Sequence, residues 1–147
     1  RVDVTKGRGN KDFGKGFYVT SVREQAERWA KRKAALLGSD KAIINVYEMK
    51  EKTEGLKVKS FAPDLMDWID FVCECRDGKT EYQKYDLIYG KVANDRVFRV
   101  VDMYHTGIWD KERALKEIKV YPTYDQIAFI TQEAIEKLLV FKSFQEV

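Results

Sequence analysis

The stretch that decides the fold lies at positions 6–20 and reads Lys6-Gly7-Arg8-Gly9-Asn10-Lys11-Asp12-Phe13-Gly14-Lys15-Gly16-Phe17-Tyr18-Val19-Thr20. Closely spaced glycines lead here into a short strand that carries adjacent aromatic residues. Because glycine has no Cβ and tolerates positive φ, a flat ligand or a phosphate can approach the main chain. The stretch matches neither the G-x-x-x-x-G-K-[ST] loop nor the G-x-G-x-x-G fingerprint. From these residues alone, a glycine-rich turn before an edge strand remains the competing interpretation.

Hydrophobic periodicity on either side of this stretch predicts a mixture of strands and helices. Strands are expected at 16–20, 42–49, 56–59, 85–89, 126–130 and 140–144. Helices are expected at 22–37, 65–76, 97–104, 110–119 and 131–139. The segment 97–104 is ambiguous, because its valines are typical of strands while their spacing is helical, and we choose the helix.

The first of these helices has clear signals at both ends. Ser21 and Glu24 have the spacing of a capping box, and Gly38 is expected to end the helix. Its inward face is expected to carry Val22, Ala26, Trp29, Ala30 and Leu37. The strand at 42–49 is expected to be buried because it is rich in β-branched residues.

Composition limits the class of protein. The chain has 147 residues, 44% of them hydrophobic and 35% charged, which fits one globular domain without a membrane span. A net charge of +3, from 27 basic and 24 acidic residues, does not indicate a dedicated polyanion binder. The chain does not start with Met or with the apolar core of a signal peptide, so we expect a cytoplasmic domain with residues missing upstream.

The cysteines and the histidine argue against two kinds of site. Cys73 and Cys75 are one residue apart, too close and too badly aimed for an ordinary disulfide. A structural zinc site needs four nitrogen or sulfur ligands, and His105 is the only histidine in the sequence. No metal is expected.

Several blocks of the sequence resemble one enzyme superfamily. Asp12-Phe13-Gly14-Lys15-Gly16-Phe17-Tyr18 is similar to the Gly-x-Gly-aromatic-Tyr strand of ADP-ribosyltransferases, and most closely to an uncharacterised bacterial family among them. The resemblance continues, in family order, through residues 24–30, 46–48, 85–95 and 125–129. It implies an α+β domain over 1–147, with a split antiparallel β core flanked by helices, whose first strand lies upstream of Arg1.

The resemblance also implies roles for individual residues. Such enzymes break the bond between nicotinamide and ribose in NAD, their substrate, and move ADP-ribose to a nucleophile. Tyr18 matches the family tyrosine that stacks on nicotinamide, and Arg8 is a plausible clamp for phosphate or ribose oxygens. Further contacts with NAD are expected from Asp12, Phe13, Gly14, Gly16, Phe17 and Asn94. Phe13 and Phe17 alternatively shape the pocket from beneath, and Asn94 alternatively caps a helix.

Two departures from the family pattern bear on activity. No His-Gly pair precedes the glycines, and His105 is too far along the chain to replace it. Gln126 stands where many relatives carry a catalytic glutamate, so position 126 keeps its hydrogen bonding but has no charge and cannot act as a base. Asp125 and Glu133 are poor substitutes, since one falls on the opposite face of the strand and the other in the next helix.

The resulting prediction is an NAD-dependent mono-ADP-ribosyltransferase with Tyr18 and Gln126 as its catalytic residues. Its acceptor is a protein or a nucleic acid, and the resemblance suggests a bacterial toxin with a small neutralising partner. The rival interpretation is a catalytically degenerate module that binds NAD, ADP-ribose or a protein. A nucleic-acid binder that uses the basic residues Arg28, Lys31 and Arg32 is a third interpretation.

Overall fold

A computed structural model of the chain describes residues 2–6, 11–61, 65–121 and 124–147. The strands are β1 (Phe17–Val19), β2 (Ile43–Met49), β3 (Val58–Ser60), β4 (Leu87–Lys91), β5 (Asp125–Phe129) and β6 (Leu139–Glu146). The α-helices are α1 (Arg23–Leu36), α2 (Met66–Arg76), α3 (Asp95–His105), α4 (Lys111–Val120) and α5 (Gln132–Leu138). Two short 3₁₀ helices, η1 (Val4–Lys6) and η2 (Glu81–Lys84), complete the described elements. The expected α+β class is confirmed.

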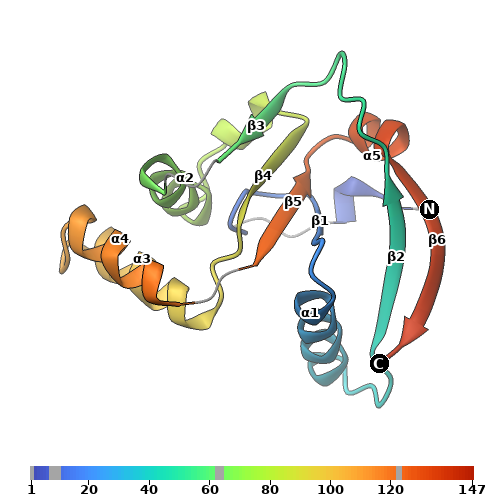
Figure 1. The fold of residues 1–147 in the computed structure, drawn as a ribbon, viewed down its shortest axis with the longest axis horizontal. Coiled ribbons are helices and arrows are strands. Elements are labelled where there is room, and N and C mark those ends of the chain that lie inside the picture. The colour runs from blue at the N-terminus through green and yellow to red at the C-terminus, as the bar shows by residue number, and fades with distance from the viewer. Residues whose placement is uncertain (1, 7–10, 62–64, 122–123) are drawn as a thin grey trace.

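The strands form two separate sheets (Figure 1). The larger sheet has the order β1-β5-β4-β3, and the smaller one pairs β2 with β6 in antiparallel fashion. In the larger sheet β5 is antiparallel to both β1 and β4, but β3 runs parallel to β4. The expectation of a purely antiparallel core is therefore wrong at this edge. Its cause is the connection through α2, because a parallel pair needs a long crossover whereas a hairpin gives an antiparallel one.

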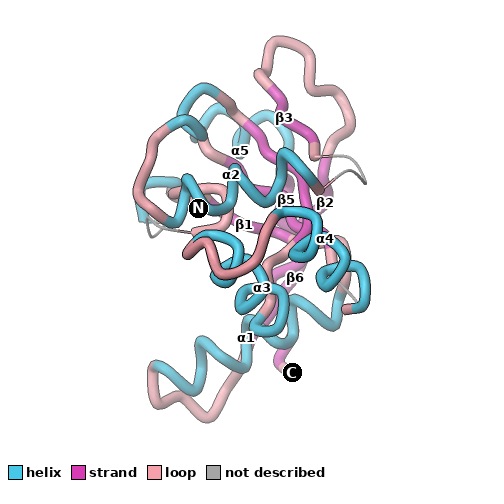
Figure 2. Tube along the Cα trace, turned by 90° about the vertical axis from the view of Figure 1, so that its left-hand side faces the viewer, coloured by secondary structure: helices cyan, strands magenta, loops and turns pink. Residues whose placement is uncertain are grey.

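Strand alternation gives the larger sheet two buried faces. One face carries Ile88 and Ala128 and packs against α2, α3 and α4, which lie in front of the strands in Figure 2. The other carries Leu87, Ile127 and Phe129 and packs against α5. The two-stranded sheet lies on this second side (Figure 1). Its strands contribute Met49 and Leu139 to the second cluster.

Three helices, α2, α3 and α5, agree with the sequence-based expectations in position. The inward residues of α2 are Leu65, Trp68, Ile69, Val72 and Cys73, and all of them are buried. The ambiguous segment is helical, and Val97, Val100 and Val101 face the core. Thr131 caps α5 by accepting a hydrogen bond from the Ala134 amide at 3.2 Å. None of the helices in the described parts of the chain is both long and apolar enough to cross a membrane.

The expected cap at the start of α1 is wrong, whereas the expected end near Gly38 is confirmed, because Leu37 is the C-cap and Gly38 follows it with a φ of +66°. Val22 takes the N-cap position, and Ser21 instead donates a hydrogen bond to the Asp125 carboxylate at 2.8 Å. Leu37, which is expected on the inward face of the helix, is 72% exposed. Because α1 packs on the narrow two-stranded sheet, it buries only a short stretch of its length, and Gln25 is its one fully buried residue.

The expectation of a buried strand at 42–49 is also wrong. Within β2 only Ile44 is buried. A sheet of two strands gives each strand one neighbour and little cover, and its second strand, β6, is exposed along most of its length. β-Branching thus predicted the strand correctly, but burial depends on what the fold lays over it.

The loop before β1 folds back over the helical face of the larger sheet. Phe13 is fully buried there and packs over Gly90, where an added Cβ would lie 2.5 Å from the Phe13 ring. Gly14 has a φ of +85°, and an added Cβ would lie 2.3 Å from the ring of Tyr82. Glycine is therefore required at 14 by backbone conformation and by space together.

We expect Gly14→Ala to lower the free energy of unfolding by about 3 kcal/mol, from left-handed strain plus overpacking against Tyr82. Gly107→Ala is a matched control, because Gly107 has a φ of +83° with open space at the Cβ position. Strain alone should make that control cost about 1 to 2 kcal/mol. Urea unfolding measures both variants, and equal losses would contradict the packing of Tyr82 on the loop.

Candidate functional site

The register of the larger sheet brings the two predicted catalytic residues onto one face. Tyr18 pairs with Ala128 across β1 and β5, and Gln126 is two residues from Ala128 on the same strand. Residues two apart on a strand share a face, and a diagonal neighbour lies about 7 to 8 Å away across the pair. Tyr18 and Gln126 therefore lie on the same face of the larger sheet.

Asp12 links this face to three other elements. Its Oδ1 accepts hydrogen bonds from Nε of Arg76, at 3.1 Å, and from Nη2 of the same side chain. Its Oδ2 accepts from the Ala93 amide at 2.9 Å and from Nε2 of Gln126 at 3.0 Å. Asp12 is only 8% exposed, so these four bonds provide what water would otherwise supply to its carboxylate. We call Asp12, Arg76 and Gln126 the Asp12 junction.

The Tyr18 side chain closes the same loop. Its hydroxyl donates to the Gly14 carbonyl at 2.6 Å and accepts from the Phe13 amide at 2.9 Å. The Tyr18 ring lies against Phe13, with centroids 6.5 Å apart. Burial raises the pKa of the Tyr18 phenol, so the hydroxyl keeps its proton and remains a donor.

A hollow of about 330 Å³ opens beside Gln126, where β4 ends and β5 begins. Its lining residues are Phe61, Tyr89, Gly90, Lys91, Tyr124, Asp125 and Gln126. Three of these are aromatic, and one cation and one anion accompany them. Tyr18 is not among the lining residues, and its ring is partly buried against the core instead.

The orientation of the Gln126 amide follows from its partners. Its Nε2 donates to the Asp12 carboxylate and, at 3.2 Å, to the Lys91 carbonyl. Both partners are acceptors only, so the NH₂ group must face them and the carbonyl oxygen must point elsewhere. Among the described residues no donor reaches that oxygen, and Gln126 lines the hollow. We infer that the oxygen is presented to the hollow.

The remaining predicted residues divide between the site and its surroundings. Phe17 lies on the opposite face of β1 and packs edge-on against Tyr47, so it does not join Tyr18. Gly16 lets β1 approach β5, since an added Cβ would lie 2.7 Å from the Phe129 carbonyl oxygen. Asn94 caps α3 by accepting from the Val97 amide at 3.1 Å. Arg8 lies outside the described residues.

Sequence reasoning missed Arg76 and the aromatic lining of the hollow. Arg76 stacks on Phe98, with its guanidinium carbon 3.9 Å from the ring centroid, while its nitrogens bind Asp12. In the sequence it is an ordinary basic residue at a helix end. Phe61, Tyr89 and Tyr124 come from three separate segments, and no spacing in the sequence connects them.

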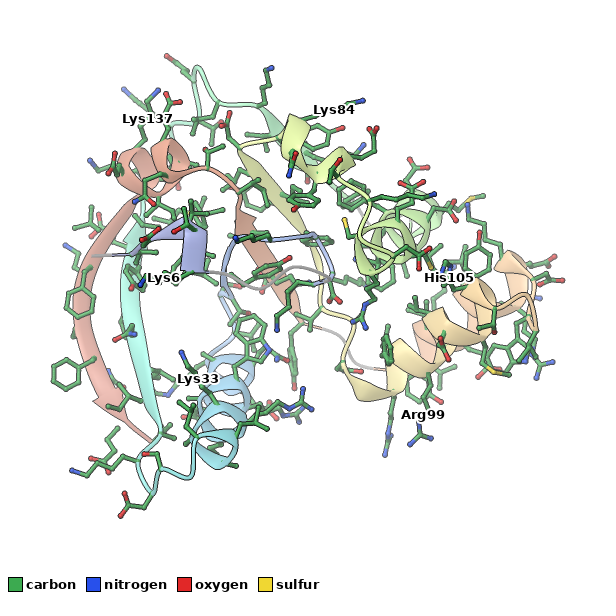
Figure 3. All side chains as sticks on the ribbon, turned by 180° about the vertical axis from the view of Figure 1, so that it is seen from behind. Lys6, Lys33, Lys84, Arg99, His105 and Lys137 are labelled. Carbon is green, nitrogen blue, oxygen red and sulfur yellow. The ribbon has the colours of Figure 1, made fainter. Side chains whose placement is uncertain are left out.

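Other polar residues named in the sequence analysis have partners of their own. His105 lies at the end of α3, near α2 and away from β1 and β5 (Figure 3), with Nε2 2.9 Å from Asp77 Oδ1. Arg28 of the basic helix pairs with Glu24 at 3.0 Å and also lies over the Tyr124 ring. No group of three or more His, Cys, Asp or Glu residues that could hold a metal ion occurs in the parts of the chain that the structure describes.

The two cysteines are buried and free. Burial raises the pKa of the Cys73 thiol to about 11 and that of Cys75 to about 12, so both remain protonated near neutral pH. Cys73 lies on the buried face of α2 and packs in the core.

Comparison with protein families places the chain in one group. A model of the family described as protein of unknown function (DUF3990) matches residues 1–141. The chain belongs to the DUF3990 family. The match covers the Asp12 junction, Tyr18 with the loop before β1, and the residues that line the hollow. No curated protein and no solved structure matches the chain.

We expect Tyr18→Phe to lower the free energy of unfolding by about 1 to 3 kcal/mol, because it leaves the Phe13 amide and the Gly14 carbonyl without their partner. Tyr124→Phe is the matched control, since the Tyr124 hydroxyl bonds Glu24 at an exposed position, and it should change stability little. Chemical denaturation measures the difference, and hydrogen exchange should speed up at the Phe13 amide in Tyr18→Phe. Equal effects of the two variants would contradict the closing role of Tyr18.

Proposed function

We propose that the protein binds the nicotinamide half of NAD in the hollow beside Gln126 and transfers ADP-ribose to a macromolecular acceptor. The observation that carries this proposal is the fixed orientation of Gln126, whose NH₂ is held by Asp12 and the Lys91 carbonyl. A carbonyl oxygen turned toward a hollow is a suitable acceptor for a ribose hydroxyl. The resemblance of residues 12–18 to ADP-ribosyltransferases supports the choice of NAD.

The lining of the hollow suits a flat ring joined to a sugar. Phe61, Tyr89 and Tyr124 offer aromatic surface for dispersion contact. Pockets that hold small ligands measure about 300 to 1,000 Å³, so a hollow of about 330 Å³ takes one half of a dinucleotide rather than all of it. The pyrophosphate and the adenosine would extend beyond this hollow, and Arg8 is a candidate contact for the phosphates.

The transfer itself asks for positioning more than for proton removal. The bond between C1′ of the ribose and the pyridinium nitrogen breaks, and its electron pair leaves with nicotinamide. An electron pair of the acceptor nucleophile then forms the new bond to C1′. Gln126 can hold the ribose hydroxyl but cannot take a proton from the acceptor, so the acceptor must lose its proton to another base. Transfer should therefore be slow and end after one ADP-ribose unit.

Tyr18 has a different role in this proposal than the resemblance implies. Its ring is packed against Phe13 and its hydroxyl is bound to the backbone of Phe13 and Gly14, so it holds the loop that carries Asp12. The stacking surface for nicotinamide is assigned instead to the aromatic residues of the hollow.

A second candidate function is a module that holds NAD or ADP-ribose without turnover. The observation in its favour is also at position 126, where the side chain is neutral and both amide hydrogens are already used. A bound dinucleotide would then lack the carboxylate whose charge favours the developing ribosyl cation.

We expect the protein to bind NAD and to release nicotinamide at a slow but measurable rate. Gln126→Ala and Tyr124→Ala should each weaken NAD binding about tenfold, since one removes the ribose acceptor and the other an aromatic wall. Gln145→Ala on β6 is the control and should bind as the unchanged protein does. Calorimetry gives the dissociation constants, and chromatography of the supernatant follows nicotinamide.

The outcomes separate the candidates. Binding with slow release that both hollow variants reduce supports the transferase. Binding without release supports the second candidate. Absence of NAD binding in the unchanged protein, or binding that neither hollow variant weakens, would rule out this location for the site.

A further inference from the structure

The Asp12 junction places a carboxylate and an amide in direct contact inside the protein. Gln126 is 3% exposed and Asp12 is 8% exposed, and Nε2 of the first lies 3.0 Å from Oδ2 of the second. The carboxylate supplies one negative charge to the pair and the amide supplies none. Arg76, which is hydrogen-bonded to Asp12, carries the opposite charge. The neutral side chains of Tyr18 and Cys75 lie near Asp12, and burial together with the negative charge of Asp12 raises the pKa of both.

We infer that Asp12 is a positioning residue that fixes the Gln126 carbonyl toward the hollow and that requires a neutral side chain at position 126. A glutamate at 126 would bring a second carboxylate to about the same distance from Asp12, with burial strengthening the repulsion. Two carboxylates that share a buried site cannot both ionise readily. Gln126 is thus not simply a catalytic glutamate that lost its charge, because the charge of the pair resides on Asp12.

The positioning role has a geometric basis independent of charge. An amide free to rotate about its last bond could present either its oxygen or its nitrogen to the hollow. Asp12 and the Lys91 carbonyl both accept hydrogen bonds, so only one of the two orientations satisfies them. The Lys91 carbonyl also accepts from Nε1 of Trp68 at 3.0 Å, which holds it in place. The link from this orientation to ribose binding rests on the proposed function, whereas the pairing of Asp12 with Gln126 does not.

Exchange of the two side chains tests the pairing. Gln126→Glu alone should be less stable than the unchanged protein at pH 7. Asp12→Asn added to Gln126→Glu should recover part of that stability, because one carboxylate and one amide face each other again. The recovery is partial, since the Lys91 carbonyl then faces a carboxylate and the Ala93 amide faces an NH₂ group. We expect the unfolding equilibrium constants to show a coupling of about tenfold between positions 12 and 126. If Gln126→Glu does not fold, recovery of folding by the second substitution is the equivalent result.

The pH dependence gives a readout that a packing defect would not. In Gln126→Glu the new carboxyl has a raised pKa in the folded state, since Asp12 and burial both disfavour its charged form. Its protonated form can donate to Asp12, so the loss of stability relative to the unchanged protein should shrink as pH falls through that raised pKa. The exchanged pair should not show this recovery. Gln83→Glu, at an exposed position of η2, is the matched control and should change stability less than twofold at every pH.

The two proposals are tested separately by measuring stability and NAD binding in four proteins. These are the unchanged protein, Asp12→Asn, Gln126→Glu and the variant with both substitutions. Additive losses for the two substitutions, or a loss in Gln126→Glu that does not depend on pH, would overturn the inference about Asp12. The expected coupling together with no NAD binding in any variant would leave the pair intact and reject the proposed function. If both hold, the exchanged pair should release nicotinamide faster than Asp12→Asn alone, because position 126 then carries a carboxylate.

Discussion

The site depends on the hydrogen bonds and the ion pair made by the buried carboxylate of Asp12. Four donors from α2, from the chain just after β4 and from β5 converge on its two oxygens. A buried carboxylate is costly unless it is paired and fully hydrogen-bonded, and this one is both. The same bonds that compensate its burial tie the loop before β1 to the helical face of the larger sheet. The orientation of the Gln126 amide and the position of the loop before β1 therefore both follow from the bonds of this one buried carboxylate.

Aromatic packing and glycine conformation hold the loop from its other side. Phe13 fills the space above Gly90, Tyr82 covers Gly14, and the Tyr18 hydroxyl ties the backbone between them. Residues 12–18 are thus held in place by packing and hydrogen bonds within the chain. Rigid placement of a few polar atoms beside an aromatic hollow is the arrangement that favours transfer by orientation. It also suits a module that only binds.

Much of the fold could be predicted because local patterns determine local structure. The spacing of apolar residues in α2 and α3 is helical and agrees with the buried faces observed, and Thr131 caps α5 as its residue type favours. The resemblance selected Tyr18 and Gln126, but their shared face follows from the register of β1 and β5, which the sequence does not give. The predicted cap of α1 is wrong because the Ser21 hydroxyl donates to the Asp125 carboxylate, about a hundred positions away along the chain. The strand at 42–49 is less buried than expected because the two-stranded sheet has little cover beyond α1.

By itself, the sequence determined the α+β class, the order of most elements and the importance of the glycine-aromatic stretch, since periodicity, capping and φ preference act within a few residues. Tertiary structure alone decided that Asp12 meets Arg76 and Gln126, that the Tyr18 ring packs against Phe13, and that Phe61, Tyr89 and Tyr124 line one hollow. Those contacts join residues far apart along the chain, and their energies depend on desolvation and packing density. Both quantities exist only once the sheet and helices have assembled.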